Sequence, residues 1–231
     1  RHTRLVSDWS SDVCSSDLGA DDLEAVSDYI IRETGEPKLL MYGSSSGALR
    51  AALFSERHPE RVKRVALDAF VWTGEGSPTL EQRRKKLPEY LKTKRRPIDK
   101  AFVRSIFERD HPGTADDKTI DAFADYILEL DDSIPNGTYI DMVTQLPLVD
   151  PEKLRCPVLI VRAEHDGIAT DEDILAFYAR LPHPDKQLVK IGGLAHTALL
   201  GVNRHRFWHA THAFLTLPDI RALGGAAAKP H

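Results

Sequence analysis

The stretch from residue 38 to residue 58 constrains the fold more than any other part of the sequence. Residues 38–42 (KLLMY) form a short apolar run that is typical of a buried strand, and residues 47–58 have the apolar spacing of a helix. The link between them is GSSSG at residues 43–47. Its two glycines remove side-chain bulk at a turn where backbones nearly collide. This pattern predicts a sharp strand-to-helix turn that holds the hydroxyl of Ser45 exposed above a sheet.

The alternation of strand and helix continues along the chain. Near-continuous apolar strands suit a sheet that is covered on both faces, and strands separated by helices pair in parallel through right-handed crossovers. We therefore expect an α/β fold with about four parallel strands flanked by helices, with its core in residues 19–72 and 151–219. The expected strands are residues 38–42, 65–71, 157–161 and 187–191, and the expected helices start at Asp21, Gly47, Asp171 and Ala198.

Residues 73–150 interrupt this alternation. Apolar side chains recur there at helical spacing, which predicts a helical lid inserted over one edge of the sheet. Residues 81–110 contain eleven Lys or Arg and five Asp or Glu, whereas residues 111–132 contain one Lys and seven Asp or Glu. Two interpretations are open. In the first and commoner arrangement, the charges of the two segments complement each other or face water. In the second, the basic segment binds an anionic substrate.

Three polar residues lie where an active site of such a sheet is expected. A serine hydroxyl needs a base to act as a nucleophile, and ligands of open parallel sheets bind at the carboxyl ends of the strands. His196, in GGLAHT after the last predicted strand, is the expected base for Ser45. Asp166, in RAEHDG after the third predicted strand, is the expected carboxylate that orients it. Glu164 and Asp68 also lie near strand ends and are the alternative acids.

The three motifs around Ser45, Asp166 and His196 together resemble the α/β-hydrolase superfamily over about residues 19–217. Their separations of 121 and 30 residues are similar to those of members with a helical lid before the acid strand. The resemblance implies a serine hydrolase that cleaves an ester, amide or thioester of a small molecule through an acyl-enzyme. It implies no metal and no organic cofactor, and it makes the Ser46 N–H one donor of the oxyanion hole.

The resemblance leaves other functions open. Carboxylesterase-like, lipase-like or serine aminopeptidase-like hydrolysis is the first expectation. A cofactor-free perhydrolase or a carbon–carbon bond hydrolase would use the same Ser-His-Asp set. Because a fold does not by itself determine a function, an inactive or non-catalytic binding module is a further alternative.

The two ends of the chain carry separate expectations. Residues 1–18 have no periodicity, and residues 8–18 (DWSSDVCSSDL) resemble a translated sequencing-adapter oligonucleotide, so we expect a non-native tail there. Members of the superfamily place strands and the second oxyanion donor before the helix expected at Asp21, so we expect a truncated N-terminus. An open apolar edge at residues 39–42 and impaired activity or solubility would follow. Residues 220–231 are expected to fray, and the cytoplasm is the default location.

Composition excludes several classes of protein. The 31 Lys and Arg against 35 Asp and Glu leave a net charge of −4, which argues against nucleic-acid binding. No apolar run approaches the roughly 20 residues of a membrane helix, and Cys14 and Cys156 are too few for a disulfide framework.

His205, His209 and His212 share one helix face, which we expect to face water rather than a metal. The oligomeric state is not predicted.

Overall fold

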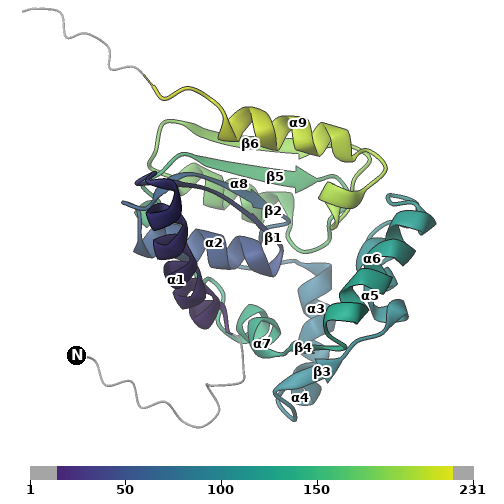
Figure 1. The fold of residues 1–231 in the computed structure, drawn as a ribbon. Helices are drawn as coiled ribbons and strands as arrows, with labels where there is room; N and C mark the ends of the chain where they lie inside the picture. The colour runs from purple at the N-terminus through teal and green to yellow at the C-terminus, as the bar shows by residue number, and fades with distance from the viewer. Residues whose placement is uncertain (1–14, 221–231) are drawn as a thin grey trace, which may run out of the picture.

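The computed structural model describes residues 15–220 (Figure 1). Its main sheet contains four parallel strands in the order β1-β2-β5-β6, which confirms the predicted α/β fold class. Strand β2 begins three residues before the predicted start and ends three residues before the predicted end. It stops at Asp68 because the next residue, Ala69, has a positive φ of 49°, which breaks the extended backbone. The strands are β1 (Leu39–Ser44), β2 (Val62–Asp68), β5 (Val158–Ala163) and β6 (Lys186–Ile191).

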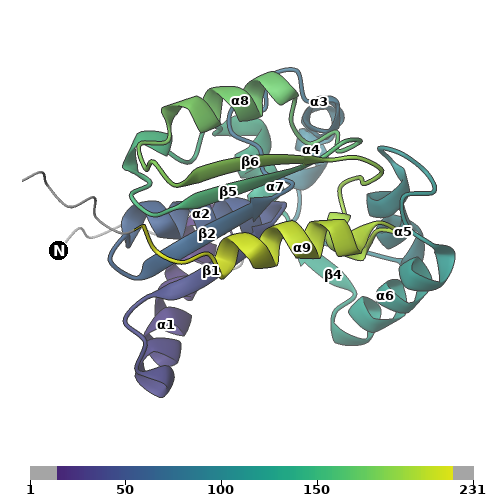
Figure 2. The ribbon, with the colours of Figure 1, turned by 90° about the horizontal axis from the view of Figure 1, so that it is seen from above.

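Helices cover both faces of this sheet. Side chains of a strand alternate between faces, so Val65 and Leu67 belong to one apolar cluster and Ala66 to another. The first cluster includes residues of α2 (Ser46–Arg57) and α8 (Asp171–Arg180), and the second includes residues of α9 (Arg204–Leu215). In Figure 2 the sheet runs between α8 and α9. Burial on both faces explains the near-continuous apolar strands.

Helix α1 (Ser16–Thr34) begins five residues before the predicted start at Asp21. The Ser15 hydroxyl accepts a hydrogen bond from the Leu18 N–H, at 3.3 Å between oxygen and nitrogen, and so caps the first turn. Gly35 ends the helix with a φ of 73°, a left-handed conformation that glycine adopts without strain. Residues 15–18 of the expected tail are therefore part of a capped helix, and residues 1–14 lie outside the described part of the chain.

The last helix begins later than predicted. Residues 198–200 form a separate 3₁₀ turn, η2 (Ala198–Leu200), and α9 starts at Arg204. Gly201 separates the two. A Cβ at this glycine would lie 2.8 Å from the Leu194 side chain and 2.9 Å from the Thr114 carbonyl oxygen. Position 201 thus has no room for a side chain, and its extended backbone, with a ψ of 165°, ends the 3₁₀ turn before α9 begins.

The segment between β2 and β5 is mostly helical, as predicted. Figure 1 shows α5 and α6 beyond the arrowhead of β5, and these two helices pack around a small apolar core of their own. Arg104 of α5 pairs with Asp117 and Asp121 of α6, so here the basic and acidic segments do complement each other. The helices are α3 (Pro78–Lys85), α4 (Leu87–Tyr90), α5 (Lys100–Glu108), α6 (Asp117–Leu130) and α7 (Gly137–Thr144), and a 3₁₀ turn, η1 (Pro151–Lys153), leads into β5.

An antiparallel pair of short strands, β3 (Arg95–Pro97) and β4 (Ser133–Pro135), was not predicted. Three-residue strands are too short to show an alternating pattern. Two helices also separate β3 from β4 in the sequence, so no local turn signal marks the pair.

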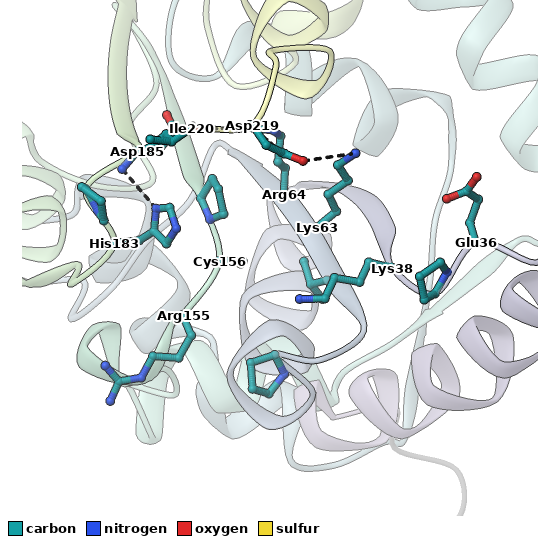
Figure 3. Close-up of a pocket in the computed structure, with 15 residues that line it drawn as sticks. Glu36, Lys38, Lys63, Arg64, Arg155, Cys156, His183, Asp185, Asp219 and Ile220 are labelled. Carbon is teal, nitrogen blue, oxygen red and sulfur yellow. Dashed lines mark hydrogen bonds and ion pairs between the residues drawn. The ribbon is translucent and has the colours of Figure 1, made fainter. Parts of the chain in front are cut away.

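The amino end of the sheet lies opposite to the predicted site and holds a charged hollow of about 650 Å³ (Figure 3). Arg64, which is 1% exposed, pairs there with Asp185 at 2.6 Å and with Asp219 at 3.3 Å. These contacts tie the end of the described chain to β2.

Strand β1 is an edge strand within the part of the chain that the structure describes. Leu40 and Tyr42 are exposed on it, as predicted for an open apolar edge. Among residues 15–220, no helix combines the length and apolarity that crossing a membrane requires.

Candidate active site

Ser45 lies at the turn between β1 and α2, as predicted. Its φ of 54° and ψ of −118° are strained for a residue with a side chain. The Ser45 N–H donates to the carbonyl oxygen of Asp68, at 2.9 Å, which ties the turn to β2. A Cβ on Gly43 would lie 2.4 Å from the Gly47 carbonyl oxygen, so Gly43 is required there. The same prediction was wrong for Gly47, because a Cβ at that position meets open space.

The structure brings Ser45, His196 and Asp166 together into one hydrogen-bonded chain. The Ser45 Oγ lies 2.9 Å from Nε2 of His196, and Nδ1 of the same ring lies 2.9 Å from Oδ1 of Asp166. Asp166 follows β5 and His196 follows β6, so all three residues lie at the carboxyl ends of parallel strands. His196 is 4% exposed and Asp166 2%, whereas Ser45 is half-buried and open to the neighbouring cavity.

The surroundings of Asp166 keep it ionised. Burial by itself raises the pKa of this carboxyl, but the charge and hydrogen bond of His196, the Ile168 N–H and the charge of Arg162 together hold the pKa below its usual value. The Ile168 N–H donates to Oδ1 at 3.0 Å, and Arg162 donates to the backbone carbonyl oxygen of Asp166 at 2.5 Å. These contacts fix the loop and its charge beside the imidazole.

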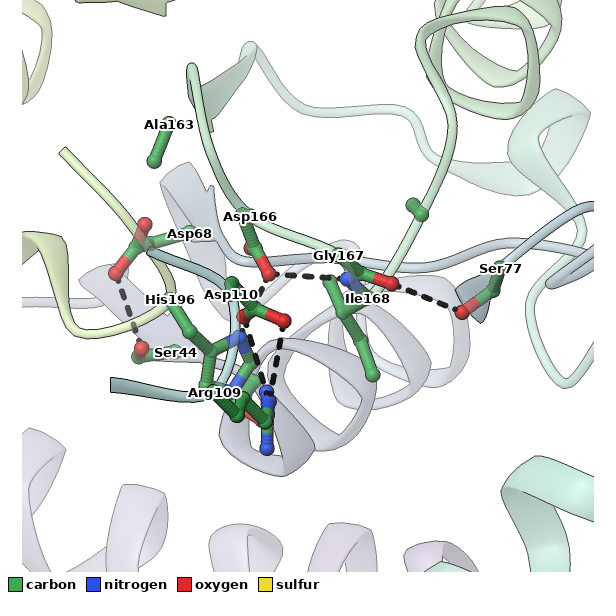
Figure 4. A network of polar contacts seen from close by, with 12 residues as sticks. Ser44, Asp68, Ser77, Arg109, Asp110, Ala163, Asp166, Gly167, Ile168 and His196 are labelled. Carbon is green, nitrogen blue, oxygen red and sulfur yellow. Dashed lines mark hydrogen bonds and ion pairs between the residues drawn. The ribbon is translucent and has the colours of Figure 1, made fainter. Parts of the chain in front are cut away.

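Neither alternative acid is bonded to His196. Glu164 accepts a hydrogen bond from the Gly193 N–H at 2.7 Å and so supports the loop that leads to His196. Asp68 accepts a hydrogen bond from Ser44 Oγ at 3.0 Å (Figure 4) and another from the Tyr42 hydroxyl at 3.1 Å. Asp68 therefore lies beneath the turn and outside the Ser45–His196–Asp166 chain.

Asp68 is a buried carboxyl with an unusual titration. Burial, opposed by hydrogen bonds from Ser44 and Tyr42 and assisted by the nearby charge of Asp166, raises the pKa of Asp68 to about 7. Its Oδ1 atom is buried and has no hydrogen-bond partner. Because folding raises this pKa, the folded state binds the proton more tightly than the unfolded chain does. The associated stability is complete below the unfolded pKa of about 4 and is lost as the pH rises through about 7.

Asp68→Asn is expected to remove this pH dependence. An amide cannot ionise, so the variant should gain about 2–4 kcal/mol in unfolding free energy relative to wild type between about pH 4.5 and about pH 8.5. Urea denaturation of both proteins at the two pH values measures the difference. Comparing the proteins cancels the other titrating groups, and a difference that does not change with pH would contradict the argument.

Asp110, which the sequence analysis did not select, lies beside His196 and Asp166 (Figure 4). One ligand atom from each of the three residues lies within 4.8 Å of the others, which is a spacing that could hold a metal ion. However, His196 Nδ1 and Asp166 Oδ1 already bond to each other. A cation bound through these atoms would have to break that bond. Asp110 also pairs with its neighbour Arg109, at 3.3 Å.

The remaining sequence-predicted groups are placed as follows. Ser46 is the first residue of α2, where an N–H has no acceptor within the helix; its oxyanion role stays a prediction. Cys156 is buried in the core, and burial raises the pKa of its thiol to about 11. His205, His209 and His212 are exposed on α9.

A cavity of about 430 Å³ opens in front of Ser45 and His196. This volume falls in the usual range for small-molecule sites. Its walls come from the Ser45 turn, the His196 loop and the segment between β2 and β5. Its apolar lining residues are Phe102, Ile106, Phe123, Ile134, Leu199 and Leu200.

Comparisons with known proteins agree with this architecture. Residues 10–201 match the family described as serine aminopeptidase, S33. None of the curated protein sequences compared with the chain matches it.

Many solved structures share the fold. An esterase from Thermogutta terrifontis is 20% identical, with a TM-score of 0.61 over 88% of this chain and 72% of its own. A monoacylglycerol lipase from Paleococcus ferrophilus is 18% identical, with a TM-score of 0.58 over 85% and 75%. A bromoperoxidase from Bacillus anthracis is 16% identical, with a TM-score of 0.62 over 91% and 76%.

At these identities, the structural likeness establishes the fold alone. The family match covers most of the chain and therefore also establishes the family. The chain therefore belongs to the serine aminopeptidase (S33) family of α/β-fold hydrolases, as its motifs predicted.

Proposed function

We propose that this hydrolase cleaves an ester, amide or thioester of a small molecule through a covalent acyl-enzyme on Ser45. The observation that carries the proposal is the hydrogen-bonded chain from Ser45 through His196 to Asp166, with both contacts at 2.9 Å. This is the arrangement in which an imidazole takes the serine proton while a carboxylate holds the ring orientation.

The reaction proceeds in two halves. Ser45 Oγ attacks the carbonyl carbon and its proton passes to Nε2 of His196. The negative charge that develops on the carbonyl oxygen is stabilised by the Ser46 N–H at the start of α2. His196 then gives its proton to the departing alcohol, amine or thiol. In the second half, His196 takes a proton from water, the hydroxide attacks the acyl-enzyme, and the acid product leaves as Ser45 regains its proton.

The strained backbone of Ser45 supports the same assignment. A serine with a φ of 54° persists only where the surrounding structure enforces it, and such residues cluster at functional sites. The turn holds Oγ toward the cavity, while the neighbouring Ser44 hydroxyl donates to Asp68 instead. Two adjacent serines thus have different environments, which provides a matched control.

A fluorophosphonate probe tests the proposal. We expect wild type and Ser44→Ala to be labelled and Ser45→Ala to remain unlabelled, because Ser45 lies against the imidazole of His196 whereas Ser44 bonds the buried Asp68 instead. Intact-protein mass spectrometry measures the label, and circular dichroism checks that each variant is folded. Labelling that survives in Ser45→Ala, or a folded wild type that takes up no label, would overturn the proposal and leave the non-catalytic alternative.

A further inference from the structure

The cavity beside Ser45 contains an excess of positive charge. Four arginines line it, Arg50, Arg83, Arg96 and Arg109, and its lining contains no Asp or Glu. Two of these charges lie near carboxylates outside the lining. Arg109 pairs with Asp110, and Arg50 lies near enough to Asp141 for its charge to oppose the rise that burial causes in the pKa of that carboxyl. The excess is therefore concentrated on Arg83 and Arg96.

Arg83 is buried without an acidic partner in the described part of the chain. Only 7% of this residue is exposed. Its guanidinium donates to the Met142 sulfur at 3.0 Å, a weak acceptor, and to the Tyr139 hydroxyl at 3.3 Å. Burial lowers the pKa of Arg83, and the positive charges of Arg109 and Arg96 lower it further. Burying a cation that is paired with no carboxylate costs free energy. Its presence here therefore indicates a functional role for Arg83.

Arg96 approaches the same place from a different element. Its Nη1 donates to Asn136 Oδ1 at 2.7 Å and to the Pro135 carbonyl oxygen at 3.3 Å. Its Nη2 is buried and has no hydrogen-bond partner. The guanidinium carbons of Arg96 and Arg83 lie 3.8 Å and 3.9 Å from the centre of the Tyr139 ring. Helix α3, strand β3 and helix α7 thus hold two cations on one aromatic ring, an arrangement that fixes both side chains.

We propose that Arg83 and Arg96 bind a carboxylate that the acyl substrate carries in addition to the bond that is cleaved. This inference rests on the proposed function of Ser45. The apolar lining residues of the cavity suit the hydrocarbon part of such a substrate, and guanidinium groups pair with carboxylates through charge-assisted hydrogen bonds. The basic segment at residues 81–110 thereby contributes an anion site as well as surface charge. A peptide with a free amino terminus is disfavoured, since its ammonium group would face cations and meet no carboxylate among the lining residues.

The test compares two esters of equal acyl length. Mono-p-nitrophenyl adipate has a terminal carboxylate, and p-nitrophenyl hexanoate has a methyl group in its place. We expect wild type to prefer the adipate by at least about tenfold in kcat/KM, because a charge-assisted hydrogen bond is lost with the methyl group. Arg96→Gln should lower kcat/KM for the adipate by about 10- to 100-fold and change the hexanoate value less than about threefold.

Arg95→Gln is the matched control. Arg95 is the neighbouring residue on β3, but its side chain is exposed and pairs with Asp131, and it does not line the cavity. This variant should behave like wild type on both esters. Arg96→Lys should retain part of the preference because it keeps the charge. Because Arg83 is buried, Arg83→Met is examined only after its folding has been checked by circular dichroism.

Binding in the absence of chemistry separates this inference from the proposed function. Calorimetric titration of Ser45→Ala with adipate should show binding that Arg96→Gln weakens by about 10- to 100-fold. An adipate analogue with a phosphonate at one end shows whether another anion competes. If the hexanoate is hydrolysed and adipate neither binds nor reacts faster, the anion site is wrong and the hydrolase stands. If adipate binds at Arg96 and neither ester reacts, the hydrolase is wrong and the anion site stands.

Discussion

Asp166→Asn is expected to lower kcat for p-nitrophenyl hexanoate by about 10³- to 10⁴-fold. In the proposed mechanism the carboxylate accepts the Nδ1 proton of His196, which leaves Nε2, 2.9 Å from the Ser45 Oγ, free to take the proton of Ser45. An amide can donate to Nδ1 instead and so favours the opposite tautomer, in which Nε2 already carries a proton. It also removes the negative charge that stabilises the imidazolium formed during the reaction.

Asp68→Asn is the control for this experiment. Asp68 is also buried near a strand end, but its side chain bonds Ser44 and Tyr42 and not His196. We expect its kcat to remain within about tenfold of wild type, since the tautomer of His196 does not depend on it. Stopped-flow or steady-state assays of both variants at one pH, with unfolding curves for each, decide between the two acids. A larger loss in Asp68→Asn than in Asp166→Asn would reverse their assignment.

Asp173→Ala is expected to reduce the free energy of unfolding by about 3–5 kcal/mol. Asp173 lies in the first turn of α8, and its carboxylate accepts hydrogen bonds from the backbone N–H groups of residues 72–74 at 2.9–3.4 Å. It also accepts from the Thr73 hydroxyl at 2.5 Å. Truncation would leave these donors without a partner, two of them in buried surroundings, at the point where the chain leaves the sheet for the lid.

Asp171→Ala is the matched variant for stability. Asp171 belongs to the same first turn, but its side chain is 43% exposed, bonds no backbone N–H of residues 72–74 and pairs with Lys190 and Arg162. Exposed ion pairs contribute about 0–1 kcal/mol, so this variant should unfold close to wild type. Urea denaturation followed by circular dichroism measures both. Equal losses for Asp171→Ala and Asp173→Ala would show that helix-terminal charge matters here and the backbone contacts do not.

The parallel sheet and the site around Ser45 were predictable because their signals are local. Strand, turn and helix follow one another within about twenty residues, and over such a range the spacing of apolar residues predicts secondary structure well. The carboxyl ends of parallel strands meet at one edge, so residues after β1, β5 and β6 had to converge there. The start of α1 was misplaced because residues 15–18 were set aside as tail, although Ser15 caps that helix.

Other features depend on contacts between distant segments. Asp166, Glu164 and Asp68 have the same chemistry and similar places in the sequence, and only the folded loops decide which one faces His196. Likewise, the β3–β4 pair joins residues about forty positions apart, and its strands are too short to carry a pattern.

The sequence by itself determined the order of strands and helices, the serine turn between β1 and α2, and the loops after β5 and β6 that bring Asp166 and His196 to it. These follow from short-range periodicity and from the chirality of strand–helix connections. Only the tertiary structure decided that Arg83 and Arg96 share one tyrosine ring beside Ser45 while Arg104 is neutralised by neighbouring acids. The sequence alone does not show which charged side chains are neutralised. Packing decides this, because it removes water from some charges and gives only some of them a partner of opposite charge.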